Sequence, residues 1–312
     1  MGQPVEYVDR RTGERVVESV MGDGALRFAY ETLAGRTLWP VLFGSRLVSA
    51  VMGWRYDSPS SKKAIAQLVA IPGCRADEAE RPVSAYGSFN AFFTRRLKPG
   101  ARPVGEGFVS PADGRLRLYL GADADKPFPL KGATKSLREV FAPGADTAQG
   151  VFDFEKTYDI AVIRLAPVDY HRFHFPCESR LLGAVRVVPG KYHSVNPIAL
   201  LRYPDVYADN ERQIVECDSA YGRYWSVDVG AFGVGTIVQT FAGGAVEADG
   251  DEEGEGRRRV FEKGEERGYF KFGGSTVILV MKAGAVRWDD DLVRNSSEGI
   301  ETRVFCRERI GR

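Results

Sequence analysis

The sequence lacks the features that mark several specialised classes of protein. Its 312 residues include only four cysteines, which are far apart and form no Cys-x-x-Cys pair. A disulfide framework is therefore not expected, and free thiols in a reducing compartment are the simpler prediction. The 43 basic and 42 acidic residues give a net charge of +1, so no overall field would draw the chain to nucleic acid.

Long hydrophobic runs are also missing. No stretch of about 18 apolar residues occurs, and residues 1–20 are polar and charged. The sequence therefore predicts neither a confident transmembrane helix nor a signal peptide. The nearest approach is the segment 38–54, which Pro40, Gly44 and Arg46 interrupt. With 44% hydrophobic and 27% charged residues, the chain has the composition of a globular protein with a substantial core.

The chain consists of two regions that differ in their pattern of apolar residues. Residues 25–70 have helical spacing. From about residue 104, short apolar runs alternate with Gly, Pro and Asp, which is typical of strands and turns. These runs are 115–120, 160–165, 184–188, 226–229, 236–241 and 276–281. We therefore expect an α+β fold, with an N-terminal helical, membrane-associating region at 1–103 and a β-rich, mainly antiparallel catalytic domain at 104–312. The acidic, then basic segment 242–259 is expected to be a mobile surface loop.

The apolar residues around position 45 support two interpretations. Aromatic residues flank them and arginines lie nearby, as in an amphipathic helix at a lipid interface. A helix packed on the protein's own core has a similar pattern, so both interpretations stay open. The apolar set is Trp39, Leu42, Phe43, Leu47, Val48, Val51 and Trp54.

Histidine is scarce, and its placement is informative. The chain has only His171, His174 and His193, which all fall within 23 residues. A single histidine is usually a hydrogen-bonded structural residue, but this clustering beside apolar runs favours a functional site. A zinc site is a weaker alternative, because no cysteine or carboxylate stands at ligand spacing; no metal is expected.

Two further segments carry groups that could act with these histidines. Asp113 lies in a Ser-Pro-Ala-Asp-Gly turn, and Ser275 follows two glycines directly before an apolar, β-branched run. A carboxylate that orients a histidine, and a histidine that deprotonates a hydroxyl, make a nucleophile. A phosphate-cradling loop at 273–276 would need a helix after it, whereas 277–281 has the pattern of a strand.

Six motifs, in order along the chain, together resemble the phosphatidylserine decarboxylase proenzyme family. Each alone would be a weak signal, but the ordered set is specific, and the similarity runs from about residue 26 to about residue 311. The motifs are 88–97 (SFNAFFTRRL), 110–114 (SPADG), 169–176 (DYHRFHFP), 191–197 (KYHSVNP), 229–236 (VGAFGVGT) and 263–276 (KGEERGYFKFGGST).

The resemblance implies a role for particular residues. Ser275 matches the serine that attacks the carbonyl of Gly274 and becomes a covalent pyruvoyl cofactor. Asp113 and His174 match the pair that activates this serine, and His171 matches a histidine tied to substrate handling and decarboxylation. His193 and Asn196 match a segment that helps to line the substrate pocket.

The resemblance also implies the products and partners. Self-cleavage would give a large chain, 1–274, and a small chain of 38 residues (275 to 312 inclusive). The mature enzyme would decarboxylate phosphatidylserine to phosphatidylethanolamine as a peripheral protein on the cytoplasmic side of the cell membrane, with homo-oligomers as an open alternative. Rival functions are decarboxylation of a soluble amino acid and an uncleaved, non-enzymatic membrane protein. The joint presence of Asp113, His174 and Ser275 argues against the second rival.

Overall fold

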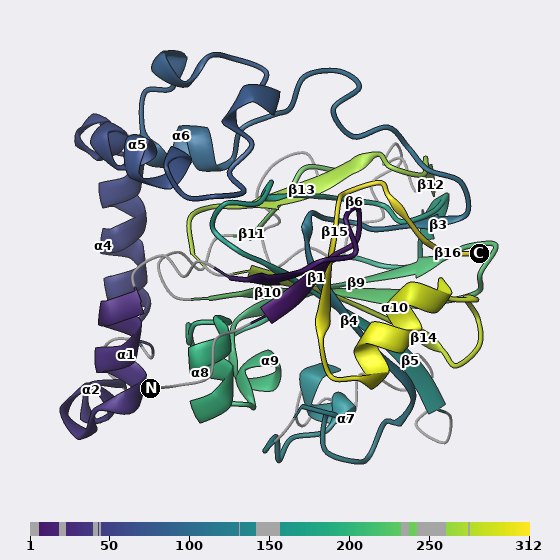
Figure 1. Ribbon diagram of the computed structural model, residues 1–312. Helices are drawn as coiled ribbons and strands as arrows, with labels where there is room; N and C mark the ends of the chain where they lie inside the picture. Colours follow the sequence, from purple (N-terminus) through teal and green to yellow (C-terminus); the bar gives the residue numbers. More distant parts are fainter. Residues whose placement is uncertain are drawn as a thin grey trace.

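The computed structural model of the chain describes residues 6–18, 23–39, 43, 45–130, 132–141, 157–231, 237–241, 260–273 and 275–312. Within them, an eleven-stranded sheet forms the centre of the molecule (Figure 1). All neighbouring strands are antiparallel except β1 and β15, which are parallel. In spatial order the strands are β12 (Val260–Phe261), β7 (Ser179–Leu181), β9 (Arg212–Asp218), β10 (Tyr224–Gly230), β14 (Ser275–Lys282), β5 (Thr157–Leu165), β4 (Gly114–Asp123), β15 (Glu301–Val304), β1 (Glu6–Asp9) and β2 (Arg15–Val17), with β8 (Arg186–Val188) beside β9.

Strand β14 shows why the sequence folds this way. Residues 277–281 of the strand are apolar and mostly β-branched, and every residue of β14 except Lys282 is buried. Alternate residues face opposite sides of a sheet. Val277 and Leu279 accordingly join one hydrophobic cluster, whereas Ile278 and Val280 join another. The sheet is therefore covered on both faces, and the start of β14 lies deep inside the protein.

Smaller elements complete this domain. A second sheet contains β11 (Ile237–Gln239), β13 (Glu266–Phe270) and β6 (Arg172–His174), and a third pairs β16 (Arg309–Gly311) with β3 (Phe108–Val109). The short helices are α7 (Leu137–Phe141), α8 (Pro197–Arg202), α9 (Val206–Asp209) and α10 (Asp290–Ser297). The chain passes from β13 in the second sheet to β14 in the large sheet through residues 271–274, so the proposed cleavage site lies between two sheets.

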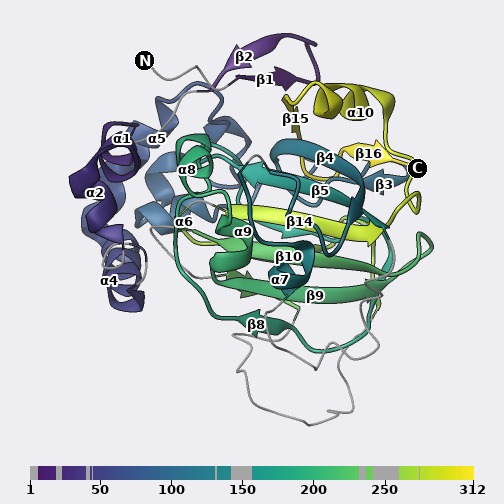
Figure 2. The same cartoon turned by 90° about the horizontal axis from the view of Figure 1, so that it is seen from below.

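The N-terminal helices stand along one side of the molecule (Figures 1 and 2). They are α1 (Asp23–Glu31), α2 (Leu33–Thr37), α4 (Arg46–Asp57), α5 (Lys63–Val69) and α6 (Phe89–Phe93), with the 3₁₀ turns η1 (Pro59–Lys62), η2 (Ala76–Glu78) and η3 (Val83–Ala85). Serine side chains cap two of the α-helices: Ser45 accepts a hydrogen bond from the Val48 amide, and Ser88 accepts one from the Ala91 amide. Within the described residues, no helix has both the length and the apolar character needed to cross a bilayer.

The predicted α+β class is confirmed, and each of the six predicted apolar runs overlaps a strand. The sequence analysis did not predict the hairpin of β1 and β2, whose polar residues 6–17 carry no clear alternating pattern. Pairing with β15 and ion pairs from Arg10 to Asp289 and Asp291 hold it in place. The domain division at 103/104 stays a prediction, and the segment 242–259 lies outside the described residues.

The lipid-facing interpretation does not hold for every member of the apolar set. Phe43 is only 2% exposed, because it stacks on Tyr30 and contacts His193, and Trp39 packs beside it. Val51 and Trp54 are 55% and 75% exposed, as an interfacial helix requires. Phe43, which precedes α4, therefore packs inside, whereas Val51 and Trp54 of α4 face outward. Leu42 and the side chain of Leu47 lie outside the described residues.

Candidate functional site

Ser275 begins β14, and strands on both sides hold its backbone. It pairs with Gly230 of β10 and Leu165 of β5. Its side chain is fully buried, and Oγ has no hydrogen-bond partner among the described residues. Leaving a buried hydroxyl unpaired costs about 1–3 kcal/mol. Such exceptions in folded proteins need an explanation, and a catalytic role is one.

His171 carries a second buried atom that has no hydrogen-bond partner among the described residues. Its Nδ1 lies 3.0 Å from the carbonyl oxygen of Asp169, and its own carbonyl accepts a hydrogen bond from Phe270, five residues before Ser275. Burial lowers the pKa of His171 to about 3, so the ring is neutral at pH 7. A carbonyl can only accept, so Nδ1 carries the proton and Nε2 keeps its lone pair. Within the part of the chain that the structure describes, that Nε2 is buried without a hydrogen-bond partner.

A contact of the His171 ring and two contacts of the neighbouring Asp169 fix the position of the imidazole. Its ring lies on Phe93 of α6, with ring centroids 3.9 Å apart. The carboxylate of Asp169 is held by an ion pair with Arg115 of β4 and accepts a 2.7 Å hydrogen bond from the Ala166 amide. These contacts stiffen the loop between β5 and β6 that carries the imidazole.

His174 ends β6, in a different environment. Its Nδ1 lies 3.0 Å from Sγ of Cys306, and its ring lies near that of Tyr170. Burial, and then the nearby Arg307, lower the pKa of His174 to about 3. Burial also raises the pKa of Cys306, so the thiol is protonated at neutral pH. The pair is therefore a neutral imidazole beside a neutral thiol.

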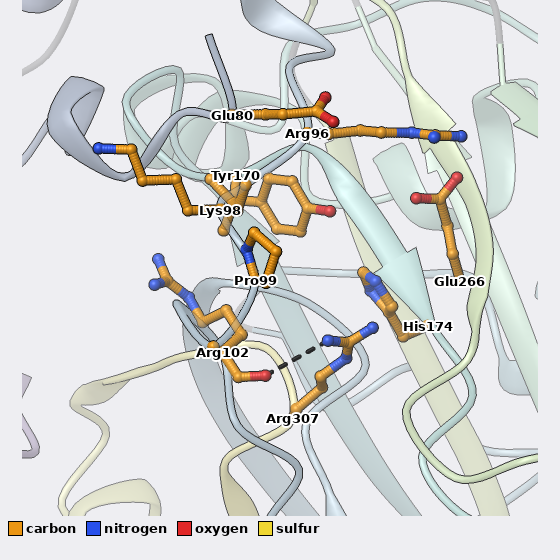
Figure 3. Close-up of a pocket in the computed structure, with 11 residues that line it drawn as sticks. Glu80, Arg96, Lys98, Pro99, Arg102, Tyr170, His174, Glu266 and Arg307 are labelled. Atoms are coloured by element: carbon orange, nitrogen blue, oxygen red, sulfur yellow. Dashed lines mark hydrogen bonds between the residues drawn. The ribbon is translucent and has the colours of Figure 1, made fainter.

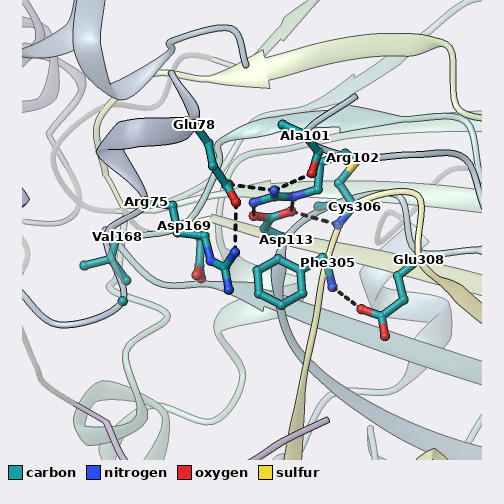
Figure 4. A network of polar contacts seen from close by, with 12 residues as sticks. Arg75, Glu78, Ala101, Arg102, Asp113, Val168, Asp169, Phe305, Cys306 and Glu308 are labelled. Carbon is teal, nitrogen blue, oxygen red and sulfur yellow. Dashed lines mark hydrogen bonds and ion pairs between the residues drawn. The ribbon is translucent and has the colours of Figure 1, made fainter. Parts of the chain in front are cut away.

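The carboxylate of Asp113 accepts three hydrogen bonds from neighbouring groups (Figure 4). Arg102 donates two hydrogen bonds to its carboxylate, of 3.0 Å and 2.7 Å, and the amide of Cys306 donates a third of 2.7 Å. Arg102 also pairs with Glu78 at 2.7 Å. Cys306 links the two side chains, because its amide donates to the Asp113 carboxylate and its thiol contacts the His174 imidazole.

The structure brings the predicted residues together only in part. Asp113 and His174 share a neighbour, Cys306, but no hydrogen bond joins them, and none joins His174 to Ser275 in the described part of the chain. Catalytic hydrogen bonds are often long or misaligned before the reacting state forms. The predicted roles of the three residues stay a prediction.

A cavity of about 270 Å³ opens beside His174 (Figure 3). Its polar lining is mostly basic, with Arg96, Lys98, Arg102 and Arg307 on its walls and Glu80 and Glu266 opposing them. Arg307 donates a 3.3 Å hydrogen bond to the carbonyl of Arg102, which closes one side. Water can therefore approach the imidazole of His174, while Ser275 is fully buried.

The two remaining predicted site residues take structural positions. His193 stacks on Tyr203, with ring centroids 3.8 Å apart, and its Nδ1 lies 3.3 Å from the hydroxyl of Tyr30. Burial lowers its pKa to about 4. Asn196 is the N-cap of α8 and accepts a hydrogen bond from the Ile198 amide. Neither lines the cavity beside His174; whether they line a substrate pocket stays a prediction.

Sequence reasoning missed Arg102, Cys306 and the pair of Asp169 with Arg115. The Arg102 guanidinium is the main partner of Asp113, yet an arginine in a Pro-Gly-Ala-Arg-Pro turn carries no local signal of that contact. Cys306 lies 193 positions from Asp113, so nothing near either residue predicts their contact. Asp169 stands inside the histidine motif, and that position was the one available signal.

Comparison with known proteins identifies the family of the chain. The family model described as phosphatidylserine decarboxylase matches residues 89–312. The chain is 35% identical to the phosphatidylserine decarboxylase proenzyme of Ruminiclostridium cellulolyticum, over 98% of this chain and 97% of that protein. It is 34% identical to the proenzymes of that name from Chlamydia pneumoniae and Fusobacterium nucleatum, in each case over 99% of this chain and 98% of the relative. The chain therefore belongs to the phosphatidylserine decarboxylase family.

Proposed function

We propose that this chain is a proenzyme that cleaves itself between Gly274 and Ser275 and then decarboxylates phosphatidylserine to phosphatidylethanolamine. The family assignment supports the substrate and the proenzyme character. The observation that carries the position is the hydroxyl of Ser275, buried and unpaired at the start of a strand held from both sides. Such a hydroxyl has no competing hydrogen bond to give up before it attacks.

Self-cleavage follows from the chemistry of a serine next to its own peptide bond. Oγ of Ser275 attacks the carbonyl carbon of Gly274, the C–N bond breaks, and the peptide becomes an ester. A base then removes the α-proton of Ser275, and β-elimination releases the large chain as a carboxylate. The remaining dehydroalanine takes up water and loses ammonia, which leaves a ketone at the start of the small chain.

The residues around Ser275 fit a pyruvoyl group. The position is fully buried, and conversion to a ketone would break no side-chain hydrogen bond that the described residues make with Oγ. When it is formed, such a group supplies the electron sink that decarboxylation requires, as pyridoxal phosphate does in other enzymes. The protein's own contribution is to exclude water and to keep proton carriers nearby.

The two histidines of the motif divide the proton transfers. We assign to His174 the removal of the Ser275 hydroxyl proton, with Asp113 acting on His174 through Cys306. This step requires the imidazole and the hydroxyl to approach each other before attack. We assign to His171 the return of a proton to carbon after carbon dioxide leaves; because its ring is neutral in the resting protein, Nε2 would first take up a proton from the ammonium group of the substrate. Its unpaired Nε2 and its rigid seat on Phe93 suit it to hold a proton at one place.

We also propose that the protein works at the cytoplasmic face of the cell membrane. The substrate is a lipid, and the N-terminal helices expose large apolar side chains on one side of the molecule. Those helices lie in one layer beside the β-rich domain (Figure 2). A peripheral position would bring lipid headgroups to this layer.

An intact-mass measurement tests the proposal. Purified protein is expected to contain two chains, 1–274 and 275–312, with the small chain lighter by one ammonia than its encoded sequence. The Ser275→Ala variant is expected to remain one chain. A wild-type protein that stays whole after long incubation would contradict the proposed function. Two chains without a ketone on the smaller one would contradict the cofactor.

A further inference from the structure

The residues just before the proposed cleavage site are attached to the helical region. Phe272 donates its backbone N–H to Oδ1 of Asn90 in a 2.8 Å hydrogen bond. Nδ2 of Asn90 donates to Asp57 at 3.0 Å, and Asp57 also pairs with Lys271 at 3.1 Å. Asn90 is only 3% exposed. One buried amide therefore connects the end of α4 to the main chain of the cleavage segment.

The side chain of Phe272 strengthens this attachment. Its ring packs against Tyr56 of α4 and against Phe89 and Phe93 of α6, with centroid distances of 4.4, 4.8 and 5.2 Å. The contacts are edge-to-face, the geometry that aromatic pairs prefer. Phe93 also carries the ring of His171. The aromatic cluster therefore touches both the cleavage segment and a histidine of the site.

The other side of the cleavage site is held by the large sheet. Ser275 pairs with Gly230 and Leu165, so its backbone cannot shift without breaking two strand pairings. Only Gly273 and Gly274 lie between this fixed point and Phe272. An attack within a chain is fast only when the reacting atoms are kept in line, and a misplacement of about 1 Å costs on the order of 100-fold.

We propose that Asn90 and Asp57 are positioning residues for self-cleavage. They anchor residues 271–272 so that the carbonyl of Gly274 is presented to Oγ of Ser275, and they retain the end of the large chain beside the site after the cut. The inference rests on the proposed function, because it presupposes that cleavage occurs between Gly274 and Ser275. It gives the helical region a part in maturation, separate from any contact with lipid.

The chain offers a matched set of variants. Asn90→Leu keeps the size of the side chain but leaves the Phe272 amide without its acceptor. Asp57→Asn keeps an acceptor for Asn90 and removes only the charge opposite Lys271. Ser61→Ala is the control: Ser61 accepts from the Phe89 amide and donates to the Tyr56 carbonyl, so its loss loosens α6 and α4 without touching residues 271–272.

The experiment follows newly synthesised precursor from cell-free translation, with the uncut fraction measured over time. Asn90→Leu is expected to slow cleavage about tenfold or more, Asp57→Asn to slow it by a smaller factor because Asn90 keeps its acceptor, and Ser61→Ala to stay close to wild type. Hydroxylamine, which splits the ester at Gly274, is expected to release no extra small chain from Asn90→Leu, because the first attack is the step impaired. Thermal midpoints are measured for each variant in the uncut Ser275→Ala background.

The outcomes separate this inference from its premise. A wild-type precursor that never splits contradicts the proposed function itself. Normal cleavage of Asn90→Leu, while wild type splits at Gly274–Ser275, overturns the positioning role alone. The inference also fails if Ser61→Ala slows cleavage as much as Asn90→Leu at an equal loss of thermal midpoint, because both would then act through stability.

Discussion

The helical region exposes large apolar side chains, whereas the β-rich domain buries charged ones. Among the described residues, five of the ten exposed large apolar side chains lie between positions 28 and 54. They are Phe28, Leu33, Leu38, Val51 and Trp54. The β-rich domain instead buries charges, most of them in ion pairs: Arg115, Arg164, Asp169, Asp228 and Arg267 are each no more than 3% exposed.

The difference shows what each region is built to do. A cluster of exposed apolar side chains marks a surface that meets another apolar phase or partner. A buried ion pair contributes little net stability, but removal of one partner is costly, so such pairs fix groups in place. The helices therefore provide a contact surface, and the sheets provide fixed positions around Ser275. Each prediction below would break or sharpen this division.

The largest effects are expected at the two histidines of the rigid domain. His174→Ala should slow self-cleavage by orders of magnitude, because the hydroxyl loses its base. His171→Ala should still cleave but lose most of its decarboxylation. Gel analysis of the chains and release of labelled carbon dioxide measure the two steps separately. A His171→Ala protein that stays whole, beside a His174→Ala protein that cleaves, would reverse the assignment.

The next effect tests the buried charges themselves. Arg267 forms two hydrogen bonds with Asp228, of 2.7 and 2.6 Å, and thereby ties β13 to β10 of the large sheet. Asp228→Ala should lower the free energy of unfolding by about 3–5 kcal/mol, because it leaves Arg267 buried and unpaired. The double variant Asp228→Leu with Arg267→Met should recover most of that loss. Urea unfolding in the uncut Ser275→Ala background measures both, and equal losses would argue that packing, and not charge, holds the two sheets.

Sequence alone predicted the parts of the fold that a local residue pattern determines. The strand after Ser275 is rich in β-branched residues, and the helices before residue 70 show helical spacing, so each element carries its own signal. The partners of Asp113 and of Phe272 do not, because Cys306 and Asn90 meet them from 193 and 182 positions away. Such contacts depend on the assembled fold. Phe43 was misplaced for the same reason, since its pattern does not show that Tyr30 covers it.

The pH dependence of stability should reveal the buried, neutral histidines. Folding lowers the pKa of His171 and His174 to about 3 and that of His193 to about 4. Between pH 6.5 and 4, the unfolded chain thus binds more protons than the folded chain. Stability is full above pH 6.5 and falls as pH drops, by about 1.4 kcal/mol per pH unit for each histidine.

His193→Phe provides the control for this prediction. It keeps a ring beside Tyr203 but cannot titrate, so about a third of the slope between pH 6.5 and 5 should disappear. Urea midpoints of the Ser275→Ala protein at several pH values give the slope. A slope of zero in this range would mean that the histidines titrate normally and are not held neutral by burial.

The smallest effect on stability, and the sharpest test of the comparison, lies on the helices. Leu33 and Trp54 are 80% and 75% exposed, and complete transfer of such a side chain from water into lipid contributes about 1.5–3 kcal/mol. The double variant Leu33→Glu with Trp54→Glu should lose most of its binding to phosphatidylserine liposomes and most of its lipid turnover. Its unfolding free energy should change by no more than about 0.5 kcal/mol, and its self-cleavage should be normal, because neither residue touches the segment 271–275.

Leu201→Glu, an equally exposed site at 74% on α8, serves as the matched control. Equal loss of liposome binding in that control would spread the lipid surface beyond the helical region. A wild-type protein that ignores liposomes and decarboxylates only a soluble amino acid would leave the exposed helices without their proposed purpose, while the chemistry at Ser275 would still stand.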